Sequence, residues 1–254
     1  MLTGIDVSQH QGSFDWKQVP KQGHVFAFVK ASEGVGFRDP QFTRNWEESA
    51  AVGLLVGAYH FARVSRVLGS VEEDAKREAG WFARQIGDVS RRLPPVLDLE
   101  WDSRAKDIKP EETIRWAKAF LAELTKLTGR TPIVYTGPSF WRYKLVKSLD
   151  LAAYPLWEAN YTSAAKPKAI PGWPWTFWQW TSTHPIGKQK IDANRYGGSM
   201  ADLEMLAGVV ATTPDAQTTK VDTLPYPDPM SLLDKLTSWL AQQTATTRSD
   251  RAKP

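Results

Sequence analysis

The amino-acid sequence predicts an α/β protein, an irregular TIM-like barrel in which five βα units are closed by three further strands, (βα)5(β)3. Up to about residue 150, short apolar runs rich in strand-forming residues alternate with stretches of helical periodicity. After that point three strand-like runs follow one another, joined by short Pro/Gly-rich links. No glycine-rich phosphate-binding loop follows the first strand, and five units are too many for a small doubly wound sheet, so a barrel is favoured.

The five strands of the first half are marked by apolar, β-branched and aromatic residues. They are expected at Gly4–Ser8, Val25–Ala31, Leu54–Ala62, Pro95–Glu100 and Pro132–Thr136. Two of the helices between them have recognisable ends. Ser70 and Glu73 form a capping box that begins one helix, which stops at Gly87. Pro110 occupies the first turn of the next helix, which stops at Gly129.

The three closing strands are expected at Leu156–Tyr161, Trp175–Thr181 and Lys190–Arg195. Fewer than a dozen residues separate the second of these from the third. Parallel strands need a longer crossover, usually a helix. At least one of the three closing strands is therefore expected to be antiparallel.

Four segments are predicted along the 254-residue chain. They are the barrel over 1–211, a Pro/Thr-rich linker over 212–228, a short amphipathic helix over 229–243 and a disordered tail over 244–254. The apolar face of the 229–243 helix could dock on the barrel, pair with a second copy of the chain, or contact a membrane or cell wall.

The composition argues against several classes of site and partner. The chain has no Cys and only four His, without an HExxH or short HxH pair, so no metal site and no cofactor are expected. Its net charge of +4 comes without a Lys/Arg run, so nucleic acid is not an expected partner. No apolar run spans a membrane and no signal peptide is visible. We therefore expect either a mature start or release by another route, such as cell lysis.

The strongest chemical signal is the segment 94–100, PPVLDLE. Residues two apart in a strand point to the same face, so Asp98 and Glu100 are expected to project together near the carboxyl end of the strand. When two carboxyls are crowded and partly desolvated, the pKa of one rises, which gives a proton donor beside an ionised partner. Cleavage of a glycosidic bond needs such a pair.

Two further acids are expected at the same end of the barrel. Asp6 ends the first strand and Asp192 lies in the last. Either one alone could be an ordinary turn or capping residue. The first and last strands of a barrel are neighbours, however, and the active sites of such barrels gather at the carboxyl ends of the strands. Four acids at one end therefore predict an active site.

These acids belong to a longer series of motifs that runs in the order found in glycoside hydrolase family 25, the lysozymes of bacteria, fungi and phages. The chain resembles this family from residue 3 to about 208. The motifs are Asp6-Val-Ser with Gln11-Gly12, FVKASEG (28–34), GAYHFAR (57–63), LDLE (97–100), PIVY (132–135), Leu156-Trp157 with Tyr161, WQW (178–180) and Asp192-Ala-Asn194.

The resemblance implies hydrolysis of the β-1,4 bond between N-acetylmuramic acid and N-acetylglucosamine in the glycan strands of peptidoglycan, with retained configuration. It implies that Glu100 is the general acid/base and that Asp98 stabilises the 2-acetamido group or the ring cation. Asp6 and Asp192 would then tune charge and position. The acetamido oxygen can serve as nucleophile, and the spacing alone fits either a retaining or an inverting enzyme. The absence of a leader fits a phage endolysin.

Seven further residues are candidates for substrate binding at the mouth of the barrel. They are Lys30, Glu33, Tyr59, Phe61, Tyr135, Trp157 and Gln179. Tyr59, Phe61 and Tyr135 are placed there because they have inward-facing strand positions next to the acids.

The alternation of side chains along a strand also assigns other residues to one face or the other. Lys30 at a strand end is expected either to hold a substrate carboxylate or to lower the pKa of an acid. His60, opposite in parity to the tyrosine before it, is expected to be packed and hydrogen-bonded. Alternation places Gln179 on one face of its strand and Trp178 and Trp180 on the other.

Two other functions have weaker support. A chitinase-like hydrolase would carry D-x-x-D-x-D-x-E, which requires Asp at positions 93 and 96, where this chain has Leu93 and Val96. A non-catalytic carbohydrate-binding barrel would not need to retain all four acids.

Overall fold

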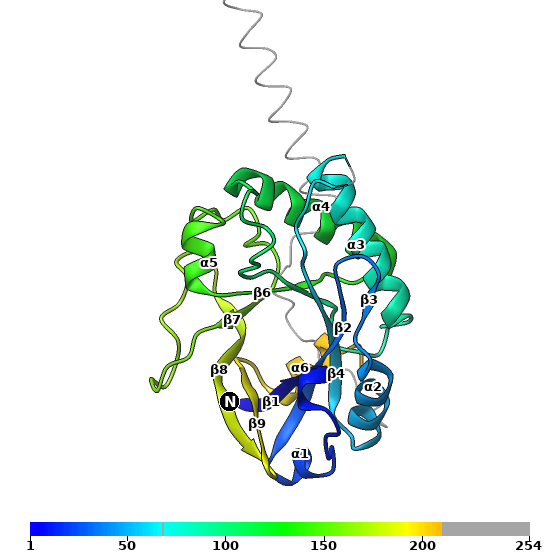
Figure 1. Ribbon diagram of the computed structural model, residues 1–254. Coiled ribbons are helices and arrows are strands. Elements are labelled where there is room, and N and C mark those ends of the chain that lie inside the picture. The colour runs from blue at the N-terminus through cyan, green and yellow to red at the C-terminus, as the bar shows by residue number, and fades with distance from the viewer. Residues whose placement is uncertain (68, 210–254) are drawn as a thin grey trace, which may run out of the picture. The chain divides into compact units, whose positions relative to one another are not determined.

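Eight strands close into a barrel in the computed structural model, which describes residues 1–67 and 69–209 (Figure 1). They are β1 (Leu2–Val7), β2 (His24–Glu33), β4 (Leu55–Phe61), β5 (Val96–Asp98), β6 (Ile133–Thr136), β7 (Leu156–Ala159), β8 (Trp175–Ile186) and β9 (Gln189–Tyr196). They follow one another around the barrel in this order, and β9 returns to β1. Neighbours are parallel except at β9, which is antiparallel to both β8 and β1. The predicted barrel with an antiparallel strand among the last three is confirmed.

Five helices follow the first five barrel strands. They are α1 (Gln18–Lys21), α2 (Phe42–Ala51), α3 (Val71–Ile86), α4 (Pro110–Thr128) and α5 (Pro138–Tyr143), with a 3-10 turn η1 (Gln9–Gln11) after β1 and α6 (Met200–Leu206) after β9. None of the helices in the described part of the chain has the length and apolar character needed to cross a bilayer. The predicted linker, helix and tail over 212–254 lie outside the described residues.

The ends of α3 and α4 largely match the sequence signals. Gly129 adopts the left-handed conformation, with φ of 65°, and ends α4 as expected. At α3 the prediction of a full capping box is wrong. The Ser70 side chain accepts a hydrogen bond from the backbone N–H of Glu73 at 3.2 Å, but the Glu73 side chain does not bond back to the Ser70 backbone.

Several strands differ from the predicted ones in their bounds. A short strand, β3 (Phe37–Arg38), pairs antiparallel with the end of β2 and was not predicted. β8 continues to Ile186 because it pairs with β9 up to a two-residue turn. β5 and β7 end earlier than predicted, so Glu100 and Tyr161 each lie two residues beyond a strand end.

The inside of the barrel is filled with aromatic rings below its mouth. Phe28 stacks on Trp157 with ring centroids 4.5 Å apart, and Phe26 and Phe177 complete the packing. Gly57 leaves room for these rings, because a Cβ there would lie 2.5 Å from the Phe28 ring. Inward positions one step closer to the carboxyl ends of the strands are polar. This change from an aromatic to a polar layer makes a floor for the site.

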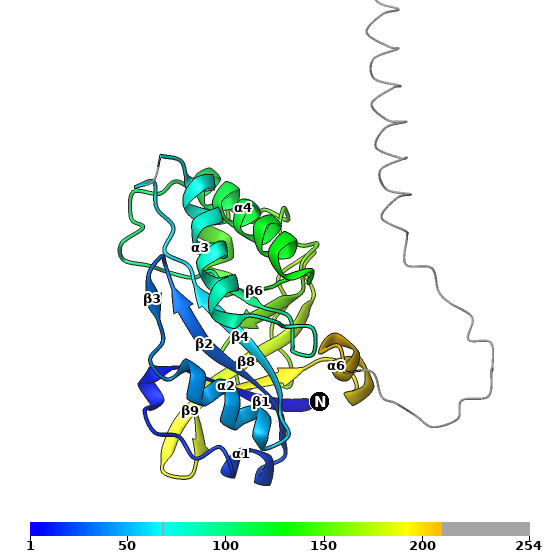
Figure 2. The same cartoon turned by 90° about the vertical axis from the view of Figure 1, so that its right-hand side faces the viewer.

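A second apolar layer separates the barrel from its helices. Outward-facing strand residues such as Val29 and Val134 pack there with helix residues such as Phe82, Trp116 and Phe120. Figures 1 and 2 show α3 and α4 side by side on the outside of the barrel. The barrel wall is therefore covered where β4 and β5 carry the central residues of the site.

A pair of histidines joins the start of β2 to the extension of β8. The Nε2 atoms of His24 and His184 lie 3.2 Å apart, and His24 is 5% exposed. One ring can donate to the other only while a ring is neutral. Burial, reinforced by His184, lowers the pKa of His24 from 6.5 to about 4.

We expect this pair to make folding sensitive to acid. Because the folded pKa of His24 lies below the unfolded one, its stabilising effect is present above pH 6.5 and is lost as the pH falls toward 4. Denaturant titrations from pH 7.5 to pH 4 are expected to show a loss in the free energy of unfolding larger by about 3 kcal/mol for the wild type than for His24→Gln. Equal losses in the two proteins would contradict the expectation.

Candidate active site

The four predicted acids meet at the carboxyl ends of the parallel strands. Asp6 lies near the end of β1, Asp98 is the last residue of β5, and Glu100 follows two residues later. β9 runs in the opposite direction, so the early part of this strand reaches the same rim, and Asp192 is directly paired with Asp6. These acids line one cavity of about 180 Å3, together with Tyr59, Tyr135, Trp157, Tyr161 and Gln179.

A chain of hydrogen bonds fixes Asp6 at the floor of the cavity. The side-chain amides of Gln179 and Asn194 donate to Asp6 Oδ2 at 2.9 and 2.8 Å. The hydroxyls of Tyr135 and Tyr161 both donate to Gln179 Oε1 at 2.9 Å. Both amides are therefore oriented with their nitrogen toward the carboxylate, and the walls of the cavity are tied to its floor.

Trp157 supports this chain from below. Its indole Nε1 donates to Asn194 Oδ1 at 2.8 Å, and only 2% of the residue is exposed. Its ring is packed against Phe28 and meets the edges of the Tyr59 and Tyr135 rings. Trp157 therefore touches the cavity mainly as a support for its polar groups and offers little free ring face to a sugar.

Asp98 and Glu100 differ in depth. Asp98 is 6% exposed, and its Oδ1 is buried without a hydrogen-bond partner among the described residues. Glu100 is exposed at the mouth, and no ion pair or hydrogen bond holds its side chain within the described part of the chain. Asp98 is thus placed to bind a group that enters the cavity. Glu100 is free to approach that group from the rim.

The crowding of carboxyls raises their pKa values. Burial, with the charge of Asp192, raises the pKa of Asp6 to about 8, and burial raises that of Asp192 to about 6. Burial also raises the pKa of Glu100, against the opposing charge of Lys30. The pKa of Asp98 is raised well above its ordinary range by burial and by Glu100. The sequence predicted a raised pKa for one member of the Asp98–Glu100 pair, and burial raises the pKa of both.

The raised pKa of Asp6 leads to a stability prediction. The folded pKa of about 8 exceeds the ordinary value of 3.8, so the folded state binds this proton more tightly, and stability is lost as pH rises between these values. Asp6→Asn carries no ionisable group there. The melting temperature of this variant relative to wild type is expected to rise from pH 5 to pH 9. Asp107→Asn, at an exposed position, serves as the control and should show no such trend.

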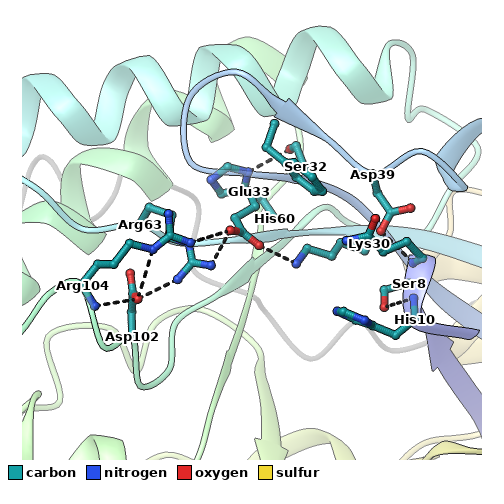
Figure 3. Close-up of polar contacts among 12 residues, drawn as sticks. Ser8, His10, Lys30, Ser32, Glu33, Asp39, His60, Arg63, Asp102 and Arg104 are labelled. Carbon is teal, nitrogen blue, oxygen red and sulfur yellow. Dashed lines mark hydrogen bonds and ion pairs between the residues drawn. The ribbon is translucent and has the colours of Figure 1, made fainter.

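A row of alternating charges lies beside the cavity (Figure 3). Lys30 Nζ bonds Glu33 at 2.8 Å, and Glu33 also accepts from Arg63. Arg63 continues to Asp102 at 2.6 Å, and Arg104 reaches Glu33 at 3.1 Å. Burial alone would raise the pKa of Glu33, but the bonds from Lys30 and Arg63 hold it at about 2. Lys30 is thereby held at the edge of the cavity. Its positive charge partly offsets the rise in the pKa values of Asp98 and Glu100.

Three of the predicted substrate-binding residues lie beside the cavity without lining it. Lys30 and Glu33 belong to the charged row, and the Phe61 ring lies under the cations of Lys30 and Arg63, at 5.1 and 4.4 Å. Tyr59, Tyr135, Trp157 and Gln179 do line it. Their contact with substrate stays a prediction.

His60 is packed and hydrogen-bonded, as its strand parity predicted. It is fully buried and lies 2.9 Å from Ser32 Oγ and 2.8 Å from Glu78 Oε2. The opposite faces of Gln179 and Trp178 are also found, since Trp178 is buried and bonds the carbonyl of Asn160. Tyr161 and Asn194 were missed as site residues. The sequence offered a signal for Asn194, because it lies two residues after Asp192 in the same strand and therefore points to the same face.

Known proteins share both the sequence and the architecture described above. A family model described as "Glycosyl hydrolases family 25" matches residues 5–188. Lysozyme M1 of Streptomyces globisporus is 35% identical over 219 residues, which cover 83% of this chain and 72% of that protein. The N,O-diacetylmuramidase of Chalaropsis is 31% identical, covering 81% of this chain and 99% of the relative. A bacterial lysozyme structure from Streptomyces coelicolor aligns with a TM-score of 0.75 at 34% identity, over 82% of this chain and 97% of that one.

Proposed function

Since the chain belongs to glycosyl hydrolase family 25 and is a lysozyme-type glycosidase of peptidoglycan, we propose that it cuts the β-1,4 bond between N-acetylmuramic acid and N-acetylglucosamine with Glu100 as the general acid/base. The observation that carries the proposal is the meeting of four carboxyls, from β1, β9 and the end of β5, in one cavity at the mouth of the barrel. The proposed site of action is the bacterial cell wall, as for the related autolytic lysozyme of Clostridium acetobutylicum.

Glu100 is suited to protonate the departing sugar oxygen. Its raised pKa favours the protonated form that a general acid needs, and its exposure at the rim lets it reach the bond between two sugar units. Once the leaving group has departed, the ionised Glu100 can take a proton from the water that completes hydrolysis.

Asp98 is suited to hold the acetamido group of the muramic acid residue. Its unpartnered Oδ1 can accept the acetamido N–H, which orients the acetamido oxygen toward the anomeric carbon. That oxygen then displaces the leaving group, and water opens the resulting ring with overall retention. Asp6 and Asp192 share a proton at neutral pH, which lowers the negative charge of the cavity.

The cleaved bond can be identified from the products. Purified cell wall is digested and the new reducing ends are reduced with borohydride. The fragments are then identified by mass spectrometry. We expect muramitol at every new end. Glucosaminitol ends, or fragments released by peptide cleavage, would contradict the proposal. Proton NMR at early times is expected to show the β-anomer of the product first, and the α-anomer first would exclude retention.

A further inference from the structure

A second hollow, of about 480 Å3, lies at the end of the charged row that is away from Lys30. It is formed by the segment after β4, one face of α3 and the loop after β5. Its wall combines the arginines Arg63, Arg77 and Arg104 with the apolar side chains of Val35, Val64 and Val67. Val35 and Val67 are 53% and 88% exposed, so the hollow is open to solvent along an apolar edge.

The charge that this hollow presents to a ligand is positive, although acids also line it. Arg77 and Arg104 are exposed. Asp74 is buried and accepts hydrogen bonds from Ser65 and from the Trp116 indole. Glu78 is buried and bonded to His60, as described above. Arg77 has no ion pair among the described residues, and Arg104 is exposed although it also reaches Glu33. Asp74 and Glu78 are already occupied.

Asp102 adds an unused acceptor. Its side chain is only 4% exposed, and its Oδ1 takes the ion pair from Arg63. Its Oδ2 is buried and has no hydrogen-bond partner among the described residues. A buried carboxylate oxygen without a donor is costly, and an N–H group of a ligand in the hollow would satisfy it.

The charged row of Figure 3 runs from Lys30, beside the catalytic cavity, to Arg63, Asp102 and Arg104, which line the hollow. Arg63 lines the hollow and bonds Glu33, which holds Lys30 beside the acids. Asp102 follows Glu100 by two residues. A substituent that leaves the cavity over Lys30 therefore arrives among the three arginines.

We propose that this hollow binds the peptide substituent of the muramic acid whose glycosidic bond is cut. The inference rests on the proposed function, because a muramidase holds that sugar in the catalytic cavity with its lactyl-peptide projecting from C3. Such a peptide carries carboxylates for Arg77 and Arg104, methyl groups for the valine edge and amide N–H groups for Asp102 Oδ2. The protein is thereby specific for glycan that still bears its peptides.

Paired substrates test this specificity. One is a soluble, uncrosslinked peptidoglycan glycan with its peptides, and the other is the same glycan after an amidase has cut the lactyl–alanine bond. The kcat/KM values are measured from the release of reducing ends. The wild type is expected to favour the peptide-bearing glycan by about tenfold, chiefly through KM, as expected for one or two charge-assisted hydrogen bonds.

Variants locate the preference in the hollow. Arg77→Ala combined with Arg104→Ala is expected to bring the ratio of the two kcat/KM values close to one, and Arg77→Lys to retain part of it. Arg91→Ala removes an exposed arginine ahead of β5 and should leave the ratio unchanged. No preference in the wild type, or an unaltered ratio in the double variant, overturns the inference while muramidase activity stands. Failure to cut either glycan overturns the proposed function and the inference with it.

Discussion

Glu100→Gln is expected to lower kcat on peptidoglycan by about 10³-fold, because removal of a general acid/base typically costs 10²–10⁴-fold. Glutamine has nearly the same shape, but its amide is not acidic enough to protonate the leaving oxygen. Since no hydrogen bond or ion pair of the Glu100 side chain holds it within the described residues, the fold should be unaffected. The measurements are reducing-end release and the clearing of a bacterial wall suspension.

Two controls separate loss of chemistry from loss of binding. The variant should melt at the wild-type temperature and bind glycan fragments with little change in Kd. Glu47→Gln alters an exposed carboxyl on α2 and is expected to keep full activity. Wall clearing by Glu100→Gln at the wild-type rate would remove Glu100 from the mechanism.

Asp98→Asn is expected to move activity and stability in opposite directions. The loss of kcat is expected to be about 10²-fold, because the substitution removes one preorganised charge next to the reacting group. The pKa of Asp98 is raised by burial, so its ionised form is costly in the folded protein. A neutral side chain of the same shape removes that cost, and the melting temperature at pH 8 should equal or exceed that of wild type.

A loss of activity without a loss of melting temperature distinguishes a functional carboxylate from a structural one. If Asp98 served only to hold the loop after β5, its replacement would lower activity and melting temperature together. If the acetamido group of the substrate is the nucleophile, azide should not rescue Asp98→Ala by forming a glycosyl azide. Rescue with a glycosyl azide product would make Asp98 itself the nucleophile.

Periodicity accounts for much of what the sequence predicted. The barrel follows from alternating strand and helix patterns, and the helix that ends at Gly129 follows from capping chemistry. The meeting of Asp6 and Asp192 needed one more step, that the first and last strands of a barrel are neighbours. These features are local in the sequence or follow from closure of the sheet.

The parts that were not predicted depend on contacts between distant segments. β3 has two residues, and it exists because it pairs with the extended end of β2. Tyr161 lies beyond β7 and reaches the site through a bond to Gln179 on the next strand. Raised pKa values at both Asp98 and Glu100 depend on burial in three dimensions. No single stretch of sequence carries that information.

The antiparallel β9 makes the site depend on the last strand of the barrel sequence. Asp192 and Asn194 come late in the barrel sequence, yet they supply the like-charged neighbour and one of the amide donors of Asp6. A nascent chain that has left the ribosome only as far as β8 holds Glu100 and Asp98, but its barrel is still open beside β1. We therefore expect activity to require the last strand in place, because only closure of the barrel brings Asp192 and Asn194 to Asp6.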